Sequence, residues 1–322
     1  MTPEYVDYGS LMTPPAPFRS LNTDLYGFWF EADRERLDAL CRKVFAEPSG
    51  GAVDYRPIGE HVMLTWGLIG QVVPETPPYD RMGSVQEPQV AIWVPVAQVR
   101  RKAGVLFAER FAMFVPYIWL DNAMSLATGR ELFGYPKSWG WPTFPAEGEP
   151  PGWQLDVFGL DYTGGESAER RPLLEVVEGE APADAPDREW HGLADMARHI
   201  ADELFELREG VHVLPGFDFA EALVEDIRGH EFPGVFLKQF RSVEDGTAAA
   251  LQQIVETRYK VTRLHASPRL REHTLTVHPL DSHPVIEELG LESQTTRLAY
   301  RVEMDFLVGG GRVVWDAAEG GR

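Results

Sequence analysis

Residues 117–142 read YIWLDNAMSLATGRELFGYPKSWGWP. An apolar strand ends in Asp121-Asn122, Gly-Arg-Glu-Leu follows at 129–132, and a turn then places Lys137 among aromatic rings, prolines and glycines. Apolar surroundings disfavour the charged form of an amine and leave a better nucleophile. The alternative is an ordinary lysine, which lays its stem over a loop and keeps its charge in water. Residue type alone favours that alternative, and the longer pattern favours a reactive amine.

This pattern resembles the acetoacetate decarboxylase-like superfamily, whose signature is a strand ending in Leu-Asp-Asn, then Gly-Arg-Glu-Leu, then an aromatic-Pro-Lys turn. The resemblance implies that Lys137 forms a Schiff base, and acetoacetate decarboxylase is itself the usual example of an activated lysine. The family pattern has a second lysine where this chain has Ser138. Without that second cation, burial against Tyr135, Trp139 and Trp141 has to activate the amine.

Two further residues fall at positions that the family uses. Glu87, in the segment 85–92, matches an active-site glutamate, which would shuttle protons during iminium chemistry. An exposed loop acid beside Pro88 is the alternative interpretation. Arg19, just before the first strand, matches an arginine whose donors would hold a substrate carboxylate. A mobile terminal arginine is the alternative there.

The family's decarboxylases also carry a glutamate on the strand that corresponds to residues 61–68, where this sequence has Leu64-Thr65-Trp66. No acid matches that glutamate. We expect Trp66, Tyr135 and Trp139 to contact the substrate. Arg130 and Glu131 are expected to hold the lysine turn through an ion pair or backbone contacts.

The chain as a whole has the composition of a globular enzyme. At 322 residues it can bury a large core, and a net charge of −20 disfavours nucleic acid and anionic membranes as partners. Cys41 is the one cysteine, which excludes an intrachain disulfide and suits a reducing compartment. Residues 1–18 lack the basic start and apolar core of a signal peptide. The apolar runs are shorter than the roughly 20 residues of a spanning helix. We therefore expect a cytoplasmic protein with no membrane partner.

Alternating and apolar runs predict strands along most of the chain, and the C-terminal third is β-rich. The segment 37–45 has helical spacing and ends before Pro48. The resemblance covers most of residues 25–315 and implies an α+β fold, mostly antiparallel β, with a closed or cone-like β-barrel, a flanking sheet and a few helices. We predict one domain over 1–322 with an acidic, helical insertion at 178–229. Apolar residues at 190–207 step by three and four, which indicates a core or subunit contact, and we expect a homo-oligomer.

Other chemistries have no sequence support. The histidines form no His-Glu-x-x-His motif, and we predict no metal and no cofactor. Glycines 309–311 are predicted to be a hairpin turn, because no helix follows them to form a phosphate site.

The leading hypothesis is a lyase that forms a lysine Schiff base with a small keto acid and decarboxylates a β-keto acid. The same intermediate also supports a pyruvate aldolase-dehydratase or cyclodehydratase, which would take an aldehyde as co-substrate. A non-catalytic small-molecule binding protein on the same fold is the third hypothesis. The sequence leaves the three open.

Overall fold

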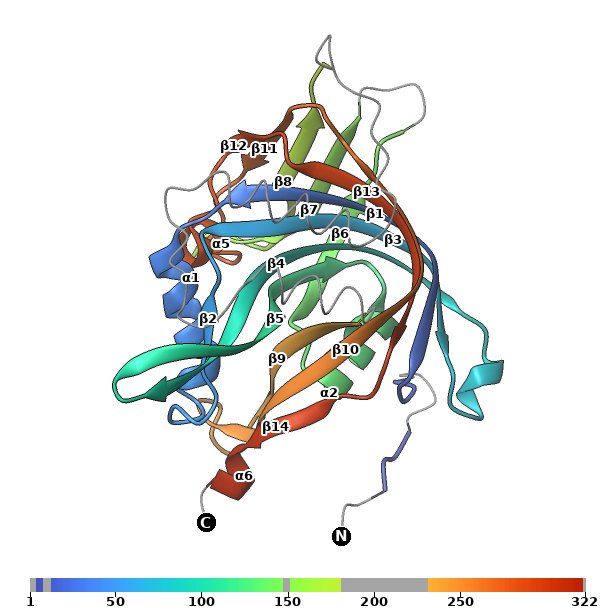
Figure 1. Ribbon diagram of the computed structural model, residues 1–322. Coiled ribbons are helices and arrows are strands. Elements are labelled where there is room, and N and C mark those ends of the chain that lie inside the picture. Colours follow the sequence, from blue (N-terminus) through green and yellow to red (C-terminus); the bar gives the residue numbers. More distant parts are fainter. Residues whose placement is uncertain (1–3, 8–12, 147–150, 181–230, 321–322) are drawn as a thin grey trace.

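The computed structural model describes residues 4–7, 13–146, 151–180 and 231–320 (Figure 1). Within them, a closed β-barrel is formed by seven strands, which neighbour one another in the order β5-β9-β10-β13-β1-β3-β4 and close by pairing of β4 with β5. All of these pairs are antiparallel except β5 and β9. The barrel strands are β1 (Phe18–Glu31), β3 (His61–Pro74), β4 (Val85–Lys102), β5 (Val105–Leu120), β9 (Glu231–Arg241), β10 (Ala249–Pro268) and β13 (Ala299–Val308).

A second group of strands continues from β5 as a flanking sheet, which stands behind β1 and β3 in Figure 1. Its order is β6 (Lys137–Thr143), β7 (Gly152–Gly159), β8 (Glu169–Glu178), β11 (His273–Val277) and β12 (Gln294–Thr296). Two short strands extend the barrel: β2 (Tyr55–Pro57) pairs with β4, and β14 (Arg312–Asp316) pairs with β10. The predicted barrel with a flanking sheet is confirmed.

Short helices cover parts of this β structure. They are α1 (Arg34–Cys41), which continues as a π-helix (Arg42–Ala46), a 3-10 turn (Tyr79–Arg81), α2 (Ala123–Phe133), α5 (Val285–Leu289) and α6 (Ala317–Gly320). Helix α1 begins at Asp33, whose carboxylate accepts hydrogen bonds from the backbone of Glu35 and Arg36. It buries Leu37 and Cys41, as the spacing predicted. The sequence pattern did not predict α2.

Strand alternation divides the apolar residues between two cores. On β1, Phe28 and Phe30 face away from the barrel axis, and the Phe28 ring lies 5.0 Å from that of Trp153 on the flanking sheet. Leu25 and Trp29, of opposite parity, face the inside of the barrel. Because side chains alternate along a strand, the same strands serve both cores. The first core joins the barrel to the flanking sheet, and the second surrounds a cavity.

The segment between β13 and β14 differs from the sequence prediction. Glycines 309–311 do not form a hairpin turn, because β13 and β14 do not pair with each other: both pair with β10, one beyond the other along its length.

The helical stretch at 190–207, and with it the predicted insertion beyond residue 180, lies outside the described residues. None of the helices that the structure describes is long and apolar enough to cross a membrane.

A buried ionic cluster joins the end of β8 to the start of β11 in the flanking sheet. Glu178 is almost fully buried and accepts hydrogen bonds from Arg269 and His273, with Arg271 Nη1 at 3.1 Å. Burial alone would raise the pKa of this carboxyl, but the hydrogen bonds from His273 and Arg269 lower it to about 2. The charged form of Glu178 therefore stabilises the fold.

We expect Glu178→Gln to reduce the free energy of unfolding by about 3 kcal/mol near neutral pH, the free-energy equivalent of the lowered pKa. A carboxyl with a lowered pKa stabilises the fold above its unfolded-state value of 4.5 and loses that contribution as the pH falls toward about 2. Urea unfolding of both proteins across that acid range checks this. A difference between them that does not shrink with falling pH would contradict it.

Candidate active site

The turn that carries Lys137 is shaped by the end of α2. Gly134 ends the helix in the left-handed conformation with φ 75°, and its N–H donates to the carbonyl of Arg130. A side chain at Gly134 would also collide with the backbone of Lys238 on β9. The chain then turns through Tyr135 and enters β6 at Lys137, which lies opposite Ile118 of β5. Glycine at 134 is what allows this close approach.

Two neighbouring residues of the Gly-Arg-Glu segment fix the lysine itself. A Cβ atom added to Gly129 would lie 2.7 Å from Cδ of Lys137 and 3.0 Å from its Cε, so the absent side chain makes room for the lysine stem. Arg130 Nη1 donates to the backbone carbonyl of Lys137 at 3.1 Å, which is the kind of contact that we predicted. Glu131 instead accepts a hydrogen bond from the hydroxyl of Tyr5.

The start of α2 positions the backbone next to Glu87. Asn122 caps the helix by accepting the N–H of Ser125 at 3.1 Å. Its side-chain amide also donates to the carbonyl of Gln86 at 2.9 Å, immediately before Glu87. The two ends of one helix therefore position the backbone on both sides of the site.

Lys137 and Glu87 form a buried pair. Lys137 Nζ lies 2.7 Å from Glu87 Oε1, and the two residues are 7% and 4% exposed. Removing both charges from water is costly, so each depends on the other as its partner. Both side chains line the barrel cavity, and they are the only charged residues among the described residues that line it. The amine and the carboxylate are close enough to exchange a proton.

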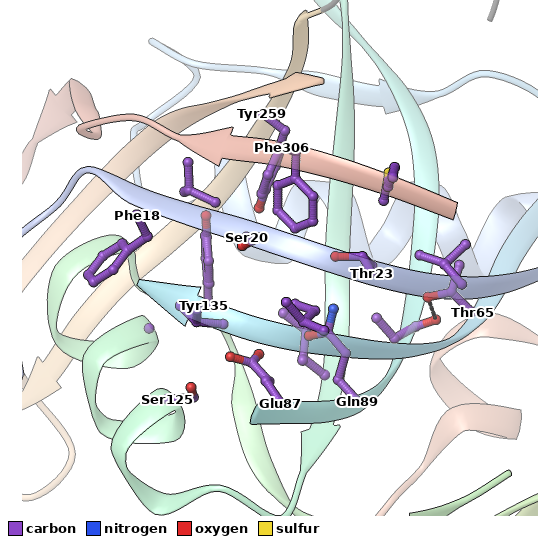
Figure 2. Close-up of a pocket in the computed structure, with 18 of the residues that line it drawn as sticks. Phe18, Ser20, Thr23, Thr65, Glu87, Gln89, Ser125, Tyr135, Tyr259 and Phe306 are labelled. Atoms are coloured by element: carbon purple, nitrogen blue, oxygen red, sulfur yellow. Dashed lines mark hydrogen bonds between the residues drawn. The ribbon is translucent and has the colours of Figure 1, made fainter. Parts of the chain in front are cut away.

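The cavity occupies the inside of the barrel and has a volume of about 320 Å³. Alternate residues of β4 face it, from Glu87 through Gln89 to Trp93. Figure 2 shows Glu87, Tyr135 and Tyr259 directed toward this space, with Phe306 on its wall. Polar side chains are few among the described lining residues, and most of the wall is apolar.

Two phenols border the cavity beside the pair. Tyr135 donates to Thr257 Oγ1 at 3.3 Å, and its ring centre lies 5.9 Å from Lys137 Nζ. Burial raises the pKa of Tyr135 well above its usual value of 10 and that of Tyr259 to about 12. Both hydroxyls therefore stay protonated at neutral pH and can serve as donors but not as bases.

The structure brings three of the six predicted site residues together: Lys137, Glu87 and Tyr135 all line the cavity. Trp66 lies on the opposite face of β3 and is fully buried, with its ring 6.2 Å from that of Phe28. Trp139, 37% exposed, lies farther along β6 against Trp141. These two tryptophans do not line the cavity.

Arg19 does not line the cavity either. Its neighbours Phe18 and Ser20 do, so strand alternation directs Arg19 outward. Its side chain is 52% exposed, and its Nε lies 3.6 Å from Oε1 of Glu75. The structure therefore separates Arg19 from Lys137.

Several lining residues were missed by the sequence reasoning. Gln89 and Trp93 share the parity of Glu87 on β4, so the two-residue period of a strand could have found them. Thr65 lines the cavity where Trp66 was expected, and its hydroxyl accepts the indole N–H of Trp93 at 2.9 Å. Tyr259 comes from a distant strand, and no local signal marks it. Within the described residues, no cluster of three metal-ligating side chains is present.

Comparison with known proteins agrees with this geometry. Residues 84–173, which contain both Glu87 and Lys137, match the family model described as acetoacetate decarboxylase. No curated protein matches the chain.

Three similar solved structures cover most of the chain. An acetoacetate decarboxylase from Legionella pneumophila is 16% identical, covers 98% of this chain and 93% of its own, and has a TM-score of 0.58. An acetoacetate decarboxylase-like enzyme from Sphingomonas wittichii RW1 is 16% identical, with 93% of each chain covered and a TM-score of 0.51. The enduracididine biosynthesis enzyme MppR is 13% identical, with 94% and 89% covered and a TM-score of 0.50.

At these identities the solved structures show a shared fold. The barrel fold, the matched segment and the buried Lys137–Glu87 pair occur together in this chain. Residues 84–173 thus resemble the acetoacetate decarboxylase family, and the chain shares the fold of acetoacetate decarboxylase-like enzymes.

We expect Gly129→Ala to displace the Lys137 side chain, because the new methyl group would lie only 2.7 Å from its Cδ, well inside van der Waals contact. The rate of reductive methylation of Lys137, followed by peptide mass spectrometry, should change at least threefold while the fold is retained. Gly246→Ala is the matched control, because a Cβ there meets nothing within 4 Å. Equal rates in both variants would contradict the packing role of Gly129.

Proposed function

We propose that this enzyme forms a Schiff base between Lys137 and the ketone of a β-keto acid and then releases carbon dioxide. The observation that carries the proposal is the Lys137–Glu87 pair, 2.7 Å apart and buried in the cavity wall. The iminium formed on the lysine is itself the electron sink, so the proposed chemistry needs no cofactor.

Imine formation begins with proton transfer from the ammonium group of Lys137 to Glu87, which leaves a neutral amine. The amine attacks the ketone carbon, and the resulting carbinolamine carries a hydroxyl group. Glu87 returns its proton to that hydroxyl, which departs as water and leaves a positively charged iminium. General acid-base steps of this kind contribute about 10²- to 10⁴-fold to rate.

Carbon dioxide loss then neutralises charge. The electrons of the bond between the α-carbon and the carboxylate move into the iminium, and a neutral enamine and neutral carbon dioxide replace a cation and an anion. An apolar wall favours this step, because it stabilises charges poorly. Protonation of the enamine carbon and hydrolysis of the imine release the ketone, with one proton taken from solvent overall.

The pyruvate aldolase-dehydratase alternative places a different demand on the site. Its substrate carboxylate remains an anion from start to finish and needs a lasting cationic partner. No arginine is found among the described residues that line the cavity, and Arg19 faces outward. This observation favours decarboxylation over condensation.

Borohydride trapping tests the proposed covalent step. Incubation with acetoacetate followed by reduction should add one ketone-derived mass to the protein, and the adduct should map to Lys137. Lys137→Ala should abolish it. Lys238→Ala is the control: burial lowers the pKa of Lys238, but that side chain does not line the cavity, and the adduct should persist.

The other hypotheses give different outcomes in the same assay. An adduct with pyruvate but no carbon dioxide from any β-keto acid would favour the aldolase-dehydratase. Absence of an adduct with every keto acid would favour a binding protein and reject the proposal.

Glu87→Gln removes the proton acceptor while keeping the side-chain shape. We expect kcat for carbon dioxide release to fall about a hundredfold or more, in line with the usual contribution of general acid-base catalysis. Glu303→Gln, on the outward-facing side of β13 beside Arg301, should leave kcat unchanged. A Glu87→Gln enzyme with native kcat would remove Glu87 from the mechanism.

A further inference from the structure

The cavity extends far beyond the lysine. Along β4 its lining runs from Glu87 to Pro95 at every second residue, about 26 Å of strand at 3.3 Å per residue. Barrel strands tilt by about 35–45°, so this corresponds to about 20 Å along the barrel axis. The catalytic pair lies near one end of this length, on the side of Phe18 and Phe133. The other end is bordered by Trp29 and Met63.

The wall beyond the pair carries no charge among the described residues. It is built mainly from apolar side chains, including those of Leu25, Met63, Phe111, Met113, Val261, Leu264, Val302 and Met304. Two polar groups there have protein partners: the hydroxyl of Tyr300 contacts the sulfur of Met63 at 2.6 Å, and the indole N–H of Trp93 is bonded to Thr65. The indole nitrogen of Trp29 and the hydroxyl of Thr23 are buried without a hydrogen-bond partner, but neither carries a charge. A ligand in this region meets a surface that rewards apolar contact.

The volume is large for a small keto acid. Pockets of about 300–1,000 Å³ hold drug-sized ligands, and this cavity falls within that range at about 320 Å³. Acetoacetate bound at Lys137 would leave the apolar part of the barrel uncovered. An anionic group at the far end would be equally unsuitable, because no cation among the described lining residues there would balance its charge.

We infer that the preferred substrate is a β-keto acid with an uncharged, apolar chain that extends from Lys137 along the barrel toward Trp29 and Met63. The position of the ketone rests on the proposed function, whereas the chain site rests on the cavity alone. Decarboxylation breaks only the bond between the α-carbon and the carboxylate, so the chain leaves unchanged on the product, a methyl ketone.

Unreactive alcohols test the chain site independently of the chemistry. Isothermal titration with 2-butanol, 2-hexanol, 2-octanol and 2-decanol should give a Kd that falls about fourfold per added methylene, the equivalent of about 0.8 kcal/mol for each buried group. A Kd that stays constant along the series overturns the inference.

A blocking variant locates the chain. Val302→Phe adds bulk to the far wall and should weaken 2-decanol at least tenfold more than 2-butanol. Val313→Phe, at a position 49% exposed on β14, is the control and should leave the ratio unchanged. If Val302→Phe fails to fold by thermal melting, Met63→Phe replaces it. A folded blocking variant with the native ratio would show that the chain lies elsewhere and overturn the inference.

Measuring the turnover of β-keto acids of increasing chain length distinguishes a failure of the chain inference from a failure of the proposed function. The kcat/KM for carbon dioxide release should rise from acetoacetate through 3-oxohexanoate to 3-oxodecanoate. Equal kcat/KM along that series overturns the chain inference while the proposed function stands. A steep alcohol series without any trapped keto acid overturns the proposed function, and the cavity remains a site for apolar chains.

Discussion

The buried contact between Lys137 and Glu87 is the constraint on which the site depends. Two charges removed from water are tolerated only when each has the other at close range, because an unpaired buried charge is strongly destabilising. Both ends of α2 serve this contact: Asn122 holds the backbone before Glu87, and Arg130 holds the carbonyl of Lys137. The segment 117–142 therefore both positions the buried pair and supplies its lysine.

The two cores explain how such a pair can exist beside a cavity. A barrel whose interior is partly open has fewer apolar contacts at its centre than a filled one. Here the outward-facing residues of β1 and β3, such as Phe28 and Trp66, pack against Trp153 and the flanking sheet. Packing on the outer face of these strands stabilises the barrel, and their inner face is therefore left available for binding. The flanking sheet is thus part of the reason that the barrel can remain hollow.

Parity along strands also separates what the sequence could predict from what it could not. The motif at 117–142 predicted the fold, and it identified Lys137 because the residues that position that lysine are close to it in the chain. Arg19 was predicted just before the first strand and Trp66 on a strand, but both lie on strands, where a shift of one residue moves a side chain to the other face. Phe18 and Ser20 face the cavity instead of Arg19, and Thr65 faces it instead of Trp66. Tyr259 could not be assigned to the site without knowing how the barrel closes, because β10 is connected to β4 only through strands that are distant in sequence.

The same apolar wall links the proposed chemistry to the inferred substrate. A surface that solvates ions poorly raises the free energy of an iminium-carboxylate more than that of the neutral enamine and carbon dioxide that replace it. That surface also binds an apolar chain, through the loss of water from both. An arginine in the wall would hold the substrate carboxylate but would stabilise it before the bond breaks, which lowers KM without lowering the barrier. The absence of arginine from the described lining is therefore consistent with a site in which the apolar chain provides the binding energy and the iminium on Lys137 provides the positive charge that the carboxylate meets.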